Sequence, residues 1–103
     1  MKIGQPYTSG TWMVKEGNEE EFIARWTQFT EWSLASAAGA EHFVLIRDTA
    51  SPRHFLSFGA WENIDAVHAW KATPEFQARL DACRALCDEF SGTEHVLAAA
   101  VGL

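Results

Sequence analysis

The sequence has few basic residues and no long apolar run, and both shortages exclude classes of function. Its 103 residues include eight Lys and Arg against fourteen Asp and Glu, a formal net charge of −6. Nucleic acids and anionic membrane surfaces are bound by clustered Lys and Arg, and no such cluster is present. No apolar stretch reaches the length of a signal peptide or a membrane span. We therefore expect no nucleic-acid or membrane partner, and a cytoplasmic location.

Cysteine is also scarce, with Cys83 and Cys87 as the two examples. They lie four residues apart in a predicted helix, where a redox or metal-binding pair is one interpretation. A zinc site needs three or four ligands, however, and no His or further Cys lies nearby. We favour the alternative that both fill the buried face of the helix as small hydrophobic residues. The sequence has no Ser-His-Asp set, glycine-rich phosphate loop or metal-ligand cluster, so we expect no metal.

Aromatic residues, in contrast, are abundant. Hydrophobic residues make up 48% of the chain, and five tryptophans, seven phenylalanines and one tyrosine are among them. A chain of this size and composition fits one globular domain with a single core. We expect an N-terminal arm over residues 1–9 and one domain over residues 10–103.

The alternation and capping patterns predict four strands and two helical regions. Asn18, with Glu21 three residues later, is typical of a helix start, and Gly39 of a helix end. Asn63 and Thr73 precede further helical segments. In order, the predicted elements are a strand over 10–15, a helix from 18 to 39, strands over 41–48 and 53–61, helical segments from 63 and from 73 to 90, and a strand over 93–101.

Each helical region carries an apolar stripe at helical spacing. The first stripe contains Phe22, Trp26 and Phe29, which we expect to pack against a sheet or, alternatively, to wall a pocket. The second stripe contains Phe76, Leu80, Cys83, Cys87 and Phe90.

Strands 41–48 and 53–61 are joined by a short polar segment with proline, which predicts a hairpin. Pairing Asp48 with Arg53 would make both faces of this hairpin apolar. The pairs would be Arg47 with His54, Leu45 with Leu56 and Phe43 with Phe58 on one face, and Ile46 with Phe55 and Val44 with Ser57 on the other.

The element order is β-α-β-β-α-β, which predicts an α+β, ferredoxin-like fold with a four-stranded antiparallel sheet. Two helical regions can cover one face of such a sheet. The other face is also apolar, so we expect a homodimer in which two sheets face each other.

Several short segments, in this order and spacing, resemble the antibiotic biosynthesis monooxygenase domain family of the dimeric α+β barrel superfamily. The resemblance spans about residues 10–100. The segments are Lys15-Glu16-Gly17, Glu20-Glu21-Phe22, Leu45-Ile46-Arg47-Asp48, Phe55 to Glu62, Ala69-Trp70-Lys71-Ala72 and Pro74-Glu75-Phe76.

The resemblance implies a homodimer with a small-molecule pocket between helices and sheet in each subunit. Members of the family include cofactor-independent oxygenases of aromatic polyketide phenols and haem-degrading enzymes. The haem-degrading branch is similar at Trp70 but has a His ten residues later and an Asn at the start of the first strand. This chain has Leu80 and Gly10 there, so no axial haem ligand is evident. We expect no cofactor.

The pocket that the resemblance implies would be walled by aromatic and apolar side chains: Trp12, Trp26, Phe29, Trp70, Phe76 and Leu80. Trp70 or Trp26 could hydrogen-bond a ligand through the indole. The candidate catalytic residues are Trp70, His68, Arg47 and His54, of which the last three could accept a proton or stabilise an anion.

Each catalytic candidate also has a structural interpretation. Trp70 could be a packing residue, His68 an exposed residue on a helix flank, and Arg47 with His54 part of the rim at the hairpin end. His42 and His95 are interpreted as structural.

The sequence thus predicts a cofactor-independent monooxygenase acting on a small aromatic, phenolic or polyketide-like ligand with O2. The alternative is a non-catalytic small-molecule-binding or accessory protein of the same fold.

Overall fold

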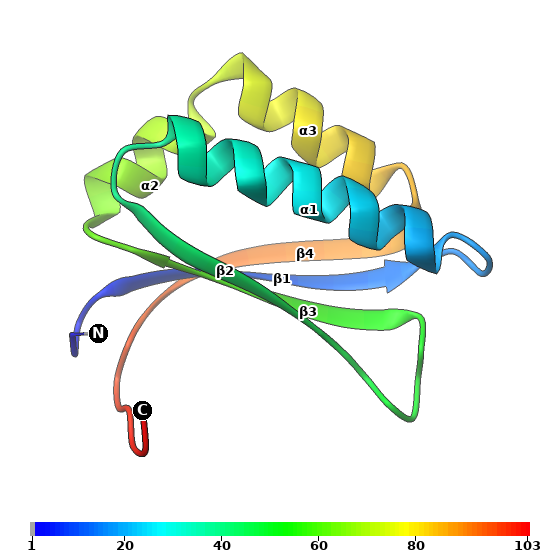
Figure 1. The fold of residues 1–103 in the computed structure, drawn as a ribbon, viewed down its shortest axis with the longest axis horizontal. Coiled ribbons are helices and arrows are strands. Elements are labelled where there is room, and N and C mark those ends of the chain that lie inside the picture. The colour runs from blue at the N-terminus through cyan, green and yellow to red at the C-terminus, as the bar shows by residue number, and fades with distance from the viewer. Residues whose placement is uncertain (1) are drawn as a thin grey trace.

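The computed structural model describes residues 2–103 and shows one antiparallel sheet with three helices on one side (Figure 1). The strand order is β2-β3-β1-β4, and every neighbouring pair is antiparallel. The elements are β1 (Pro6–Val14), α1 (Glu19–Ser36), β2 (Ala40–Arg47), β3 (His54–Trp61), α2 (Ile64–Lys71), α3 (Pro74–Arg84) and β4 (Cys87–Val96). The predicted α+β, ferredoxin-like fold is confirmed.

Two of the predicted helix caps are confirmed. The Asn63 side chain accepts a hydrogen bond from the Ala66 amide at 2.8 Å and starts α2. The Thr73 hydroxyl accepts from the Phe76 amide at 3.1 Å and starts α3, where Pro occupies the first helical position. Because α2 ends at Lys71 and Thr73 caps a new helix, the segments predicted from residues 63 and 73 are two separate helices.

The helix start predicted at Asn18 is confirmed, because α1 begins at Glu19, but the Asn18 side chain does not make the expected capping hydrogen bond. The Glu19 carboxylate instead accepts from the Gly17 amide at 3.0 Å. Backbone amide donors, those of Glu19 and Gly17, lower the pKa of Glu19 below its ordinary value. The helix end predicted at Gly39 is close: α1 ends at Ser36, and Gly39 takes a left-handed φ of 91° in the following turn.

The predicted register of the hairpin is wrong by one residue. Arg47 lies opposite Phe55, and Ile46 lies opposite Leu56. The turn is one residue longer than expected because Asp48 accepts hydrogen bonds from the amides of Ala50 and Ser51, an Asx turn that sequence spacing does not reveal. A one-residue shift exchanges the faces of a strand. Odd-numbered residues of β2 therefore face the helices, and Val44 and Ile46 face outward.

The boundaries of the outer elements also differ from the prediction. β1 begins at Pro6 rather than Gly10, so residues 6–9 of the expected arm pair with β3 and β4. β4 begins at Cys87 and ends at Val96, whereas residues 87–90 were expected to be helical. A bulge opposite Met13 and Val14 lets Cys87 and Phe90, three residues apart, both pack against the core. Residues three apart also share one face of a helix, which is why the sequence predicts a helix over residues 87–90.

The core lies between the sheet and the helices, and the opposite face of the sheet is uncovered in the single chain. Val44 is 46% exposed and Ile46 is 51% exposed on this outer face. Phe58, also outward, is 36% exposed, whereas its neighbour Phe55 is buried against the helices. Within residues 2–103, no helix combines the length and apolarity that crossing a membrane requires.

Candidate functional site

A cavity of about 270 Å³ lies between the helix-covered face of the sheet and the three helices. This volume is close to the lower end of the roughly 300–1,000 Å³ usual for small-molecule sites. All six residues predicted as substrate walls line it: Trp12, Trp26, Phe29, Trp70, Phe76 and Leu80. Phe43 and Phe90 add two more rings, and Thr8, Thr30 and Ser57 add hydroxyl groups. We call this space the aromatic cavity.

Trp70 is held at the centre of an aromatic cluster. Its ring stacks on Phe29 with centroids 5.7 Å apart, and meets Phe76 edge-on at 4.5 Å. On its other side the Trp61 ring lies 4.7 Å away. The Trp70 indole donates a hydrogen bond to the Ser33 hydroxyl at 2.9 Å, so its N–H is already paired within the protein. Trp70 therefore contributes to both the wall and the core, and the cluster fixes its orientation.

Two further tryptophans are fixed in the same way. The Trp12 indole donates to Ser57 at 3.0 Å, and the Trp61 indole donates to Thr8 at 3.1 Å. A side chain on Gly10 would approach both the Trp12 indole nitrogen and the Ser57 hydroxyl to 2.7 Å. Glycine at this position is thus required by the Trp12–Ser57 pair. A larger side chain at this position, such as asparagine, would displace this pair.

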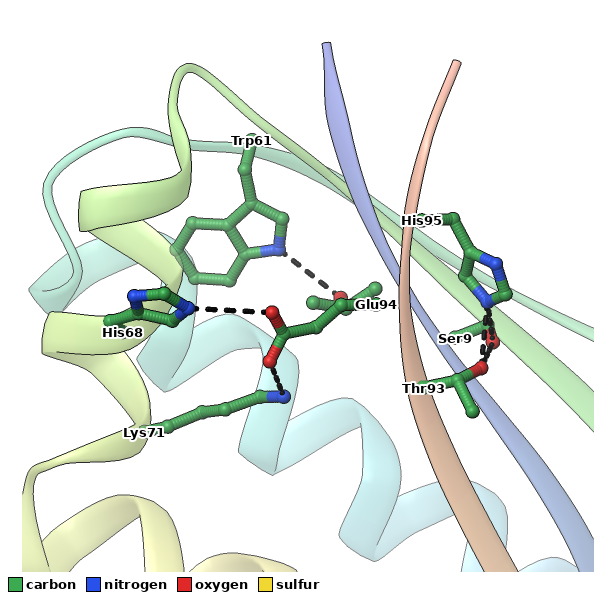
Figure 2. Close-up of polar contacts among 8 residues, drawn as sticks. Ser9, Trp61, His68, Lys71, Thr93, Glu94 and His95 are labelled. Carbon is green, nitrogen blue, oxygen red and sulfur yellow. Dashed lines mark hydrogen bonds and ion pairs between the residues drawn. The ribbon is translucent and has the colours of Figure 1, made fainter. Parts of the chain in front are cut away.

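Lys71 is the one ionisable residue, among residues 2–103, that lines the aromatic cavity. Its ammonium forms an ion pair with Glu94 of β4 at 2.7 Å, and the other Glu94 oxygen lies 3.4 Å from His68 Nε2 (Figure 2). The hydrogen bond from Lys71 is the largest of the effects that lower the pKa of Glu94. The three residues form a charged network that joins the end of α2 to β4.

Sequence reasoning predicted His68 but missed its two partners. His68 does not line the cavity; its side chain is 61% exposed and reaches the cavity wall through Glu94 and Lys71. Lys71 could have been noticed because it follows Trp70 and lies three residues after His68 on one helix. Glu94 carries no local pattern, because the antiparallel pairing of β4 with β1 brings it there.

Arg47 and His54 lie away from the cavity. The Arg47 side chain donates to the Pro52 carbonyl at 2.7 Å, and its guanidinium lies 5.1 Å from the centre of the Phe55 ring. His54 lies 3.6 Å from the Asp48 carboxylate. Neither residue lines the aromatic cavity, and the structure does not bring them together with Trp70. Their position at the hairpin end matches the structural interpretation.

His95 belongs to a second polar cluster, on the outer face of the sheet. Its Nε2 lies 2.7 Å from both the Ser9 and the Thr93 hydroxyl oxygens. Figure 2 shows these three side chains together. His42 packs edge-on against Tyr7, with ring centroids 6.3 Å apart. Within residues 2–103, no three His, Cys, Asp or Glu side chains gather as a metal site.

The two cysteines are free thiols with raised pKa values. Burial raises the pKa of Cys83 to about 12 and that of Cys87 to about 11. Thiolate is the reactive form of cysteine, and with raised pKa values both groups remain thiols at neutral pH. This agrees with their interpretation as small hydrophobic residues, although Cys87 lies at the start of β4 rather than in a helix.

The fold and the cavity define a class: an α+β, ferredoxin-like protein with an aromatic cavity between its sheet and its helices. The chain belongs to the antibiotic biosynthesis monooxygenase family, whose model matches residues 8–81. No curated protein matches the chain in sequence.

Solved structures share the fold. SnoaB, a cofactor-independent oxygenase from Streptomyces nogalater, superposes with a TM-score of 0.85 at 18% identity over 97% of this chain and 99% of its own. A variant of SnoaB gives a TM-score of 0.87 with the same identity and coverage. A candidate antibiotic biosynthesis monooxygenase from Deinococcus radiodurans gives 0.80 at 19% identity over 95% of this chain and 97% of its own. At these identities the likeness establishes the fold.

Proposed function

We propose that the protein is a cofactor-independent monooxygenase that oxidises a small phenolic or polyketide-like aromatic compound with O2. The observation that carries the proposal is the aromatic cavity, whose walls of Trp and Phe rings suit a flat apolar ligand. Lys71 at its wall suits a ligand with an acidic oxygen. Family membership and the fold shared with the oxygenase SnoaB support the same class of reaction.

The chemistry needs an electron-rich ring, which a phenol becomes when it loses its proton. The Lys71 ammonium, oriented by Glu94, stabilises the resulting phenolate at a wall made mainly of apolar rings, where charge interactions are stronger than in bulk water. The proton is released to solvent on the side of Glu94 and exposed His68. In the overall reaction of an anthrone, one oxygen atom of O2 replaces two hydrogens on the reacting carbon. The other oxygen leaves with those hydrogens as water.

The exposed apolar residues on the outer face of the sheet support a homodimer, which is also what the sequence predicts from a hairpin that is apolar on both faces. Val44, Ile46 and Phe58 leave apolar surface exposed across β2 and β3. A second copy of the sheet would cover this surface with side chains of the same kind. Light scattering at micromolar concentration should give the mass of two chains, and the mass of one chain would contradict the dimer.

Oxygen uptake tests the enzymatic proposal. The metal- and flavin-free protein should consume O2 with at least one member of a panel of anthrones, and should yield the corresponding anthraquinone and water. A Lys71→Met variant should keep ligand affinity for neutral aromatics but lose much of this turnover. If no compound is oxidised faster than in buffer alone, the proposed activity is wrong.

The alternative function is binding of an aromatic compound without chemistry. One feature favours it: no His, Asp, Glu or Cys lines the cavity among the described residues, so a proton acceptor would have to act through Lys71. Quenching of tryptophan fluorescence by a ligand that is recovered unchanged under O2 would support this alternative.

A further inference from the structure

Among residues 2–103, the Trp26 indole is the one cavity-lining indole whose N–H has no hydrogen-bond partner. The indoles of Trp12, Trp61 and Trp70 donate to Ser57, Thr8 and Ser33. Trp26 makes no such hydrogen bond to any of residues 2–103, although the residue is only 9% exposed. An indole N–H that has no acceptor in the protein is available to donate to a ligand in the cavity.

The space beside Trp26 is the aromatic cavity. No fully buried side-chain nitrogen or oxygen among the described residues lacks a partner, so the Trp26 nitrogen must retain contact with open space. The ring lines the cavity, and it is not within stacking distance of another described aromatic ring, unlike Trp12 or Trp70. A flat ligand can therefore stack on the Trp26 ring, in the position that a neighbouring aromatic ring occupies at Trp12 and Trp70.

Thr30 stands one helical turn from Trp26 on the same face of α1 and also lines the cavity. Its hydroxyl donates to the Trp26 carbonyl at 2.9 Å, with the Thr27 carbonyl at 3.2 Å. Because its proton is used on the backbone, the Thr30 oxygen has acceptor capacity left for a ligand. The wall formed by α1 thus offers a donor from Trp26 and an acceptor from Thr30.

We propose that the Trp26 indole N–H donates a hydrogen bond to a carbonyl or phenolate oxygen of the bound aromatic compound, and so selects oxygenated rings over hydrocarbons. This inference rests on the proposed function in taking an aromatic compound as the ligand. A ligand without oxygen would leave the N–H unpaired in the cavity, which costs about tenfold in affinity. Trp26 is then a specificity-determining residue of the site.

The test compares two bicyclic probes of nearly equal shape, 1-tetralone with a carbonyl oxygen and tetralin without it. Neither is a phenol, so binding is measured apart from turnover. Calorimetry on the wild-type protein should show tetralone binding about tenfold more tightly than tetralin. In Trp26→Phe, which keeps an aromatic ring but lacks the N–H, this preference should disappear through weaker tetralone binding, with tetralin affinity little changed.

The matched control is Trp32→Phe. Trp32 also makes no indole hydrogen bond within residues 2–103, but it lines a separate surface hollow beside Ala66 and Thr73. This variant should keep the preference for tetralone. A Trp26→Phe protein that keeps the full preference, or that weakens both probes equally, would overturn the inference.

A measurement on the wild type covers the case in which Trp26→Phe does not fold. With 15N-labelled indoles, one of the five indole N–H resonances should shift downfield on adding tetralone and stay in place with tetralin. If no indole resonance shifts with tetralone, or neither probe binds, the inference is wrong. Absence of oxygen uptake with bound phenols would count against the proposed function alone, because the tetralone preference does not depend on turnover.

Discussion

The two faces of the sheet use the same strands for different purposes. On the covered face, Phe55 and Ser57 of β3 contribute to a core and to the wall of the aromatic cavity. On the outer face, Leu56 and Phe58 of the same strand remain accessible in the single chain. Alternation along one strand therefore separates a ligand site from a surface for assembly. The difference shows why this strand is apolar on both sides.

The largest expected effect on stability comes from removing a large buried side chain from the covered face. Phe22 of α1 is fully buried, with its ring centroid 5.1 Å from that of Trp12 and 5.2 Å from that of Phe55. Phe22→Ala should lower the free energy of unfolding by about 3–5 kcal/mol, because it removes buried area and leaves a hole. Urea denaturation measures this loss. Leu34→Ala, on the exposed side of α1, is the control and should change stability by less than about 0.5 kcal/mol.

The second effect concerns the outer face. Ile46→Asp would place an unpaired carboxylate in an apolar interface, at a cost of several kcal/mol, and so weaken the proposed dimer by roughly 100-fold. Light scattering over a dilution series should show this variant dissociating while the isolated chain stays folded by circular dichroism. Leu34→Asp adds the same charge to an exposed apolar site outside the sheet. If both variants, or neither, change the mass, the outer face is not the interface.

A smaller effect is expected at the back of the aromatic cavity. Trp70→Phe removes the indole that donates to Ser33, and leaves a buried hydroxyl without that partner. The free energy of unfolding should fall by about 1–3 kcal/mol. A double-mutant cycle with Ser33→Ala separates this hydrogen bond from lost packing. Purely additive losses in the cycle would show that the bond contributes nothing.

The smallest effect is a pH dependence of stability from Glu94. Its pKa is lower in the folded protein than its ordinary value of 4.5, chiefly because Lys71 donates a hydrogen bond to it. The ion pair therefore stabilises the fold at pH values above 4.5, and this contribution is lost as the pH falls below that value. Glu94→Gln should flatten this part of the stability curve slightly, since the pair is partly exposed. Glu31→Gln, at an exposed carboxylate without an ion pair in residues 2–103, is the control for removing one carboxylate.

The cavity walls could be predicted from sequence because they depend on short-range periodicity. Phe29 follows Trp26 by three residues on one helix, so the helix itself brings both to one face. Trp70 was found through the resemblance of its segment to a family. The helix caps at Asn63 and Thr73 are likewise local, since each side chain reaches an amide three residues away.

The missed features depend on pairing between distant segments. The hairpin register follows from hydrogen bonds of Asp48 inside the turn, and the start of β4 follows from a bulge against β1. Ser33, Ser57 and Thr8 become partners of buried indoles only after strands and helices pack together. Glu94 reaches Lys71 for the same reason. A single sequence contains no spacing rule for such contacts.

The most direct test of the comparison between the two faces is a crystal structure of the protein soaked with an aromatic phenol in the absence of O2. We expect the ring inside the aromatic cavity, beside Trp26, Phe29 and Trp70, with an oxygen atom within hydrogen-bond distance of the Trp26 nitrogen. We also expect a second copy of the chain to cover the outer face. A ligand bound on the outer face, with the cavity empty, would contradict the assignment of the two faces.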